Sequence, residues 1–208
     1  MAAPERYIVV DLDGTYYIGN TLHDYLRTAM RWHLAGGRFG RVFSIMSLGA
    51  LRALRIISHR RFKESALAAA GSDSATLELF AAEAMKRINM PLQRWLREQE
   101  SDCGVIMATA APRFYARLLW PGAMVATEFD GRAMEAECRG EEKLARVKAA
   151  IGSGCIHTTV TDHSDDLPLM RESVGRVILV APSETTKRVL KVNGIQYEES
   201  LEAFGGAR

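Results

Sequence analysis

Two blocks of alternating strand and helix patterns, with a long helical stretch between them, constrain the fold of this chain more than any other feature. Four short apolar runs, rich in β-branched residues, are typical of buried parallel strands: residues 7–12, 104–108, 156–160 and 177–180. Helical patterns lie near residues 112–119, 141–151, 167–173 and 184–193. Strands that alternate with helices predict an α/β fold: a Rossmann-like, three-layer core around a central parallel sheet.

The stretch between the two blocks, from about Asn20 to Glu100, reads as helix throughout. The chain has 208 residues, which is more than a minimal single-core domain needs and fewer than two full domains need. We therefore expect a core made of residues 1–19 and 101–208, with an inserted all-α sub-domain at residues 20–100.

Composition and targeting patterns narrow the class of protein. Hydrophobic residues make up 48% of the chain, which excludes a disordered chain, and the net charge of +2 gives no reason to expect a nucleic-acid partner. Three cysteines without C-x-x-C spacing favour a reducing, cytoplasmic setting. The start of the chain lacks a signal-peptide pattern. The apolar stretch Val42–Leu51 is about half the ~20 residues that a membrane-spanning helix needs.

Positive charge is concentrated in the insertion. Residues 21–64 contain nine Lys or Arg against two acids, a local charge of +7. The arginines available to contact a substrate or another anion are Arg27, Arg31, Arg52, Arg55, Arg60 and Arg61. Both an anion-facing surface and a solvated basic helix face fit this pattern.

Apolar residues beside these arginines also allow two interpretations. They are Trp32, Phe43, Ile45, Met46 and Leu48. Contact with a membrane surface or a lipid phosphate fits them, and core packing inside the insertion explains the same residues.

Carboxylates and a hydroxyl follow three of the predicted strands. Asp11 and Asp13 come after the first strand, Thr109 after the second, and the acidic segment 162–166 after the strand at 156–160. Ligands of open parallel sheets bind beyond the carboxyl ends of the strands, so we expect these groups at one rim. Clustered carboxylates repel one another unless a cation is bound, and their oxygens suit Mg²⁺. An ionised aspartate near Mg²⁺ is a credible nucleophile toward phosphorus.

Four motifs in this order resemble those of the haloacid dehalogenase superfamily of hydrolases, over nearly the whole chain. They are D-x-D-G-T from Asp11, a strand ending in threonine at Thr109, the lysine of Gly140-Glu141-Glu142-Lys143, and D-x-x-x-D from Asp162 to Asp166. The fourth motif and the helical insertion resemble the phosphoserine-phosphatase-like branch (subfamily IB), which has a helical C1-type cap. Two positions depart from the pattern: Thr161 replaces a frequent glycine, and His163 a frequent serine.

The resemblance implies catalytic roles for the matching residues. Asp11 would attack phosphorus and form an aspartyl-phosphate, and Asp13 would protonate the leaving oxygen and then activate water. Thr109, the Ala110 amide and Lys143 would bind the transferring phosphoryl group. An acid at the second position favours phosphate chemistry over dehalogenation, because a departing halide needs no proton.

The resemblance also implies a Mg²⁺ site. The ion would be held by the Asp11 carboxylate, the backbone carbonyl of Asp13 and Asp162, with Asp166 supporting it through water or hydrogen bonds. The sequence leaves open whether Asp165 or Asp166 has this last role. Lys148 is a competitor of Lys143, and His163 could tune the metal shell or only bond to the backbone.

The expected activity is that of a Mg²⁺-dependent phosphatase, which hydrolyses a phosphomonoester of a small metabolite. Two alternatives remain at this point. A phosphotransferase or mutase would use the same site and pass the phosphoryl group to another acceptor. A non-catalytic module would use the basic insertion to bind an anion or a lipid surface. The oligomeric state is not predicted.

Overall fold

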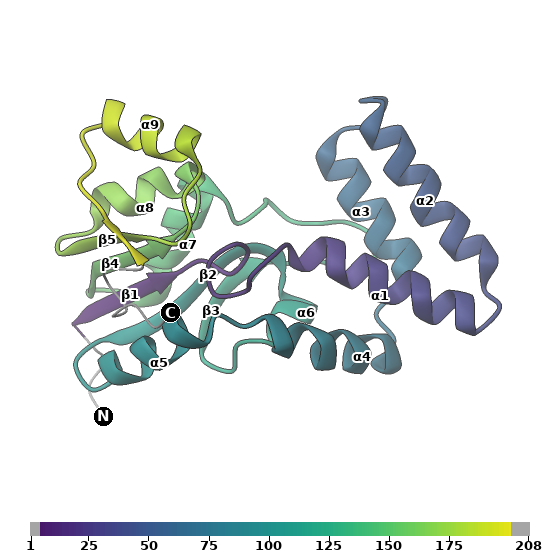
Figure 1. Ribbon diagram of the computed structural model, residues 1–208, viewed down its shortest axis with the longest axis horizontal. Helices are drawn as coiled ribbons and strands as arrows, with labels where there is room; N and C mark the ends of the chain where they lie inside the picture. The colour runs from purple at the N-terminus through teal and green to yellow at the C-terminus, as the bar shows by residue number, and fades with distance from the viewer. Residues whose placement is uncertain (1–4, 201–208) are drawn as a thin grey trace.

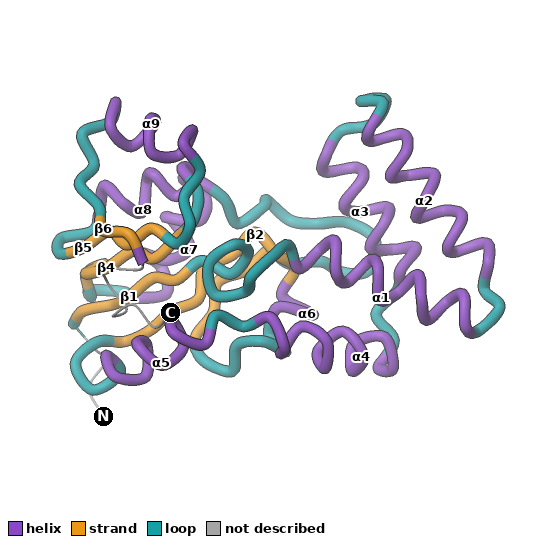
Figure 2. Tube along the Cα trace, viewed as in Figure 1, coloured by secondary structure: helices purple, strands orange, loops and turns teal. Residues whose placement is uncertain are grey.

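The computed structural model describes residues 5–200, so the ends of the predicted core, residues 1–4 and 201–208, lie outside the described residues. Six strands form one sheet in the order β3-β2-β1-β4-β5-β6, and every neighbouring pair is parallel. Their bounds are β1 (Arg6–Val10), β2 (Gly104–Pro112), β3 (Ala123–Thr127), β4 (Cys155–Thr161), β5 (Arg176–Leu179) and β6 (Glu198–Glu199). The predicted α/β class with a central parallel sheet is confirmed (Figure 2).

Helices cover both faces of this sheet. The core helices are α5 (Met90–Gln99), α6 (Arg113–Ala116), α7 (Gly140–Ile151), α8 (Leu167–Glu172) and α9 (Glu184–Val192), with a 3₁₀ turn η2 (Ser164–Asp166) before α8. Figure 1 shows α5 on one side of the sheet and α7, α8 and α9 on the other. Alternate residues of β1 follow the same division, because Val9 belongs to the apolar cluster of α7 and Val10 to that of α5. The three predicted layers are therefore present.

The remaining helices stand to one side of the sheet (Figure 1). They are α1 (Thr21–Ala35), α2 (Phe39–Ala53), α3 (His59–Ala70) and α4 (Ser74–Ala84), followed by a 3₁₀ turn η1 (Met85–Arg87). We call α1 to α4 the cap. Asn20 and Asp73 begin α1 and α4 as N-caps, with side-chain oxygens that accept from backbone amides at 3.0 Å. No helix of the described residues has the length and apolar character needed to cross a bilayer.

Aromatic rings join the cap to the core. Tyr25 of α1 stacks on Tyr115 of α6 with centroids 5.0 Å apart, and it meets Phe80 of α4 edge to face at 5.4 Å. Both tyrosines are fully buried. Such pairs contribute beyond their buried area, so α1 and α4 are held against the end of the sheet where β2 leads into α6.

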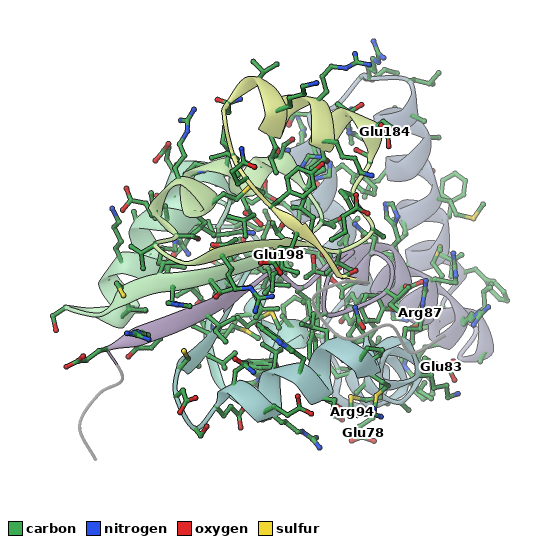
Figure 3. The ribbon with its side chains drawn as sticks, turned by 60° about the vertical axis from the view of Figure 1, so that its left-hand side comes forward. Glu78, Glu83, Arg87, Arg94, Glu184 and Glu198 are labelled. Carbon is green, nitrogen blue, oxygen red and sulfur yellow. The ribbon has the colours of Figure 1, made fainter. Side chains whose placement is uncertain are left out.

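The two chain segments that enter and leave the cap run side by side. The Ile18 amide donates to the Arg87 carbonyl, and the Asn89 amide donates to the Tyr16 carbonyl, both at 2.8 Å. Arg87, which Figure 3 shows beyond the end of α4, also pairs with Asp24 of α1 at 2.5 Å. These bonds fix the start of α1 relative to the end of β1, where the predicted site lies.

Some boundaries differ from the sequence-based expectation. Strand β2 continues to Pro112, although we expected it to end at Ala108, and α6 has only four residues. Within the insertion, which we expected to be helical throughout, α4 ends at Ala84 and the chain tightens into the 3₁₀ turn η1. Strand β3 was not expected, because its sequence AMVAT contains two alanines and a methionine in place of a β-branched run.

Candidate active site

Strand β1 delivers Asp11 to the rim of the sheet. The strand ends at Val10, and the Asp11 amide still donates to the Val160 carbonyl of β4 at 2.9 Å. Gly14 follows with a φ of +75°, a conformation that favours glycine. A Cβ at this position would lie 2.1 Å from Oδ2 of Asp162. Glycine therefore allows the first-strand loop and the Asp162 carboxylate to approach each other closely.

Lys143 connects two of the predicted acids. It lies in the first turn of α7 and is buried, and its Nζ is 2.9 Å from Oδ1 of Asp11 and 2.6 Å from Oδ1 of Asp166. The other oxygen of Asp166 accepts from the Thr161 hydroxyl at 2.8 Å. The hydroxyl that replaces a frequent glycine at position 161 thus orients Asp166.

The two competing residues, Asp165 and Lys148, do not contact the pair of Asp11 and Lys143. Asp165 pairs with Arg139 at 2.5 Å and with His163 Nδ1 at 3.0 Å, on a partly exposed edge of the site. Lys148 pairs with Glu172 at the surface, at 2.8 Å. Of the competing residues, Asp166 is therefore the acid that contacts Lys143.

Burial dominates the electrostatics of these carboxylates. It raises the pKa of Asp11 to about 8, although the ammonium group of Lys143 acts in the opposite direction. Burial also raises the pKa of Asp162. For Lys143, burial lowers the pKa, but the carboxylates of Asp11 and Asp166 outweigh it, and the net pKa is above its usual range. One lysine thus faces more buried carboxylates than it can neutralise.

The donor set fits a hard divalent cation that keeps part of its water shell. Asp11 and Asp162 line the same cavity and present carboxylate oxygens, and burial raises the pKa of both, so a further cation beside them would favour their ionised forms. The Asp13 and Asp166 side chains are engaged by other groups. Within residues 5–200 no group of three or more His, Cys, Asp or Glu side chains could hold a metal ion. Mg²⁺ usually takes one or two carboxylates, with waters and phosphate oxygens completing its shell.

Asp13 is held by the first residue of the cap. The Thr21 amide donates to Oδ1 of Asp13 at 2.5 Å, and the Thr21 hydroxyl donates to Oδ2 at 3.2 Å. The carboxyl group therefore lies at the N-terminus of α1. Burial raises its pKa, and the hydrogen bonds from Thr21 act in the opposite direction. A buried carboxyl group with a raised pKa is suited to donating a proton.

These residues surround one cavity of about 310 Å³, at the lower end of the range for small-molecule sites. The sequence-predicted residues that line it are Asp11, Asp13, Thr109, Ala110, Lys143, Asp162 and Asp166. All seven predicted site residues thus lie around one space. The cap contributes further walls, among them His23, His59 and Lys63.

Lys63 and Glu137 also lie at the cavity, although neither belongs to a motif of the sequence. Lys63 Nζ donates to the Ala110 carbonyl at 2.9 Å and forms an ion pair with Glu137. Lys63 is 5% exposed. It belongs to the basic stretch of the insertion, but no motif separates it from the other cations there. Its place at the cavity depends on how α3 packs against the core.

We expect Lys63→Met to destabilise the folded protein by about 1–3 kcal/mol, because Glu137 loses its buried cation and the Ala110 carbonyl loses a donor. Urea denaturation followed by tryptophan fluorescence measures this change. Lys86→Met is the matched control, since Lys86 pairs with Glu83 at the surface, where both side chains are more than half exposed. Equal midpoints for the two variants would contradict a structural role for the Lys63 contacts.

Comparisons with known proteins bear on the family and the fold of this chain. A sequence profile of the haloacid dehalogenase-like hydrolases matches residues 8–171. A protein of unknown function from Bordetella pertussis Tohama I is similar in structure, with a TM-score of 0.69 and 21% identity over 95% of this chain and 98% of that one. A search of the curated proteins finds no significant match.

Two further solved structures carry names that describe a reaction. A phosphoserine phosphohydrolase-like protein from Francisella tularensis SCHU S4 has a TM-score of 0.57 and 15% identity over 92% of this chain and 94% of that one. A phospho-aspartyl intermediate analogue of phosphoserine phosphatase has a TM-score of 0.53 and 15% identity over 89% and 90%. At these identities the likeness shows the fold, whereas the profile covers most of the chain. The chain therefore belongs to the haloacid dehalogenase-like hydrolase family.

Proposed function

We propose that this protein is a Mg²⁺-dependent phosphatase that hydrolyses the phosphomonoester of a small metabolite through an aspartyl-phosphate on Asp11. The observation that carries the proposal is the double contact of Lys143 with Asp11 and Asp166 inside the cavity. A buried carboxylate beside a fixed ammonium group is suited to attacking an anionic phosphoryl group, because the cation offsets their repulsion. The names of the neighbouring phosphoserine phosphatase structures support the same reaction class.

In the first step, an oxygen of Asp11 bonds to phosphorus and the bond from phosphorus to the ester oxygen breaks. Lys143 already engages Oδ1, so we assign the attack to Oδ2. Asp13 transfers its proton to the leaving oxygen, and the alcohol departs. Thr109 and the Ala110 amide, which line the cavity, bind the transferring phosphoryl group together with Lys143.

In the second step, the Asp13 carboxylate accepts a proton from water, and the water oxygen bonds to phosphorus. The bond between phosphorus and Asp11 then breaks, which releases inorganic phosphate and restores both aspartates. Bound Mg²⁺ would neutralise charge on the phosphoryl oxygens. Asp11, Asp162 and the backbone carbonyl of Asp13 would hold it, with Asp166 in support.

We further propose that the insertion of residues 20–100 provides a C1-type cap over a core of residues 1–19 and 101–208, as in the phosphoserine-phosphatase-like branch, subfamily IB. Within it α1 to α4 form the cap itself, whereas α5 packs on the sheet as part of the core. The contribution of α1 and α3 to the cavity wall supports a cap that closes over the substrate and limits its size. The three cysteines are free, which supports a place in the reducing cytoplasm.

The activity is tested with purified protein, Mg²⁺ and a panel of small phosphomonoesters, including phosphoserine. We expect inorganic phosphate to be released, turnover to stop when a chelator removes the metal, and turnover to return with added Mg²⁺. Transfer of the phosphoryl group to an added alcohol without phosphate release would identify a phosphotransferase instead. Tight binding of phosphate without any turnover would overturn the enzymatic proposal.

A further inference from the structure

Helix α2 stands on the outer side of the cap and leaves most of its surface uncovered. Figure 1 shows it beside α3 and remote from the sheet. Of its 15 residues, only Val42 and Ile45 are buried. A surface helix normally turns its apolar residues inward and its polar residues outward. The outer face of α2 departs from this rule.

Large apolar side chains line that outer face and the turn after it. We call this set the α2 stripe: Phe39, Phe43, Met46, Leu54 and Ile56. Each is between 63% and 73% exposed, whereas Ile45, which lies between them in sequence, is buried. The first four recur at helical spacing and therefore share one side of the helix. An exposed apolar surface of this kind is typical of an interaction site.

The charges around the α2 stripe are all of one sign. Residues 25–63 contain nine Lys or Arg and no Asp or Glu. The exposed cations Arg38, Arg41 and Arg55 flank the stripe, and no ion pair of residues 5–200 includes them. A second copy of this chain would bring like charges together across such a contact. The complementary surface is therefore anionic.

Arg55, one of these cations, adopts an unfavourable backbone conformation at the end of α2. Arg55 has a φ of +59°, and the Ile56 amide donates back to the Leu51 carbonyl at 2.9 Å, a helix stop that usually has glycine at this position. Glycine would adopt this conformation more readily, so the backbone conformation does not explain why an arginine occupies this position.

We propose that the α2 stripe docks this protein reversibly on a lipid bilayer that contains anionic headgroups. The helix would lie in the interface, with Phe39, Phe43 and Met46 inserted between headgroups. The arginines would reach the phosphates beside them. This inference is independent of the proposed function, because α2 contributes no residue to the cavity.

The test is flotation of the purified protein with two kinds of vesicle, phosphatidylcholine alone and phosphatidylcholine with about one third phosphatidylglycerol. We expect binding to the anionic vesicles and much weaker binding to the neutral ones. The partition coefficient falls roughly fivefold for each of Arg38→Gln, Arg41→Gln and Arg55→Gln. The double variant Phe39→Ser/Phe43→Ser loses at least about tenfold.

Matched controls separate docking from general changes in polarity and charge. Val192→Ser removes an apolar side chain that is 81% exposed on α9, and Arg94→Gln removes an exposed cation on α5, outside the α2 stripe. Both should bind like the wild type. Circular dichroism shows whether the double variant is folded, and we expect it to be, because both phenylalanines are exposed.

Two results would overturn the docking proposal. One is the absence of binding to anionic vesicles, or equal binding by the wild type and the folded double variant. The other is a concentration-dependent dimer in analytical ultracentrifugation that the double variant loses, without any vesicle binding. The α2 stripe would then be the contact with a second copy of this chain.

Discussion

Asp11→Asn is expected to reduce phosphate release by at least about 10⁴-fold, because the covalent step needs a carboxylate oxygen at this position. The amide is a poor nucleophile, and no other carboxylate is held by Lys143 at the end of β1. Steady-state turnover with saturating Mg²⁺ and the best substrate of the panel measures the loss. Trapping of ³²P on the wild type but not on the variant locates the bond.

Asp165→Asn is the control for this experiment. It changes the same chemical group one residue before Asp166, in a position where the carboxylate pairs with Arg139 at the edge of the site. We expect its turnover to stay within about tenfold of the wild type. Turnover of Asp11→Asn in that same range, with an intact circular dichroism spectrum, would refute the assignment of Asp11 as nucleophile.

Lys143→Met is expected to have the largest effect on stability, a loss of about 3–5 kcal/mol at neutral pH in the metal-free protein. Methionine matches the length of the side chain but leaves Asp11 and Asp166 buried without their cation. Chemical denaturation measures the free energy of unfolding. Lys148→Met, which breaks a half-exposed pair with Glu172, should lose less than about 1 kcal/mol.

The pH dependence of this loss has a defined sign. Burial gives Asp11 a folded-state pKa of about 8, above its ordinary value of 3.8, so the folded protein binds more protons than the unfolded chain between these values. Stability associated with this group is full below the ordinary pKa and is lost as the pH rises through the folded pKa. Without Lys143 the pKa of Asp11 rises further, because the ammonium group lowers it in the wild type. The deficit of Lys143→Met should therefore shrink as the pH falls toward 3.8, and a deficit that grows would contradict this explanation.

Much of the core could be predicted because its information is local. Three of the four strand runs and the helices after residue 140 agree with the structure to within a residue or two, since buried parallel strands and amphipathic helices have distinct periods. The run at 104–108 has the right start but ends four residues before β2 does. Strand β3 was missed because a short edge strand with alanines has no such signature. The continuation of β2 to Pro112 was missed because its pairing with Thr127 of β3 follows a register shift, which is set by contacts distant in sequence.

The candidate site, like the core, has residues that the sequence predicts and residues that it does not. Asp11, Asp13, Thr109 and Lys143 could be named because strand ends and a helix start place them in order along the sequence. The sequence did not predict two hydrogen bonds of the site, because folding brings their partners together. In these bonds Thr161 orients Asp166 and Thr21 holds Asp13. The sequence also left open which apolar residues near the cap arginines are buried, and the structure shows that Ile45 is buried and Phe43 is exposed.

The strand order has a consequence for how this chain is made. Strand β1 lies in the middle of the sheet, and its neighbours begin at Gly104 and Cys155, so it leaves the ribosome long before either partner exists. The cap helices, whose contacts are mostly local, can form meanwhile. An apolar segment that stays exposed and unpaired during synthesis can aggregate or bind a chaperone. Strand β1, which leads directly into Asp11, is thus among the first elements to be synthesised and among the last to find its partners in the sheet.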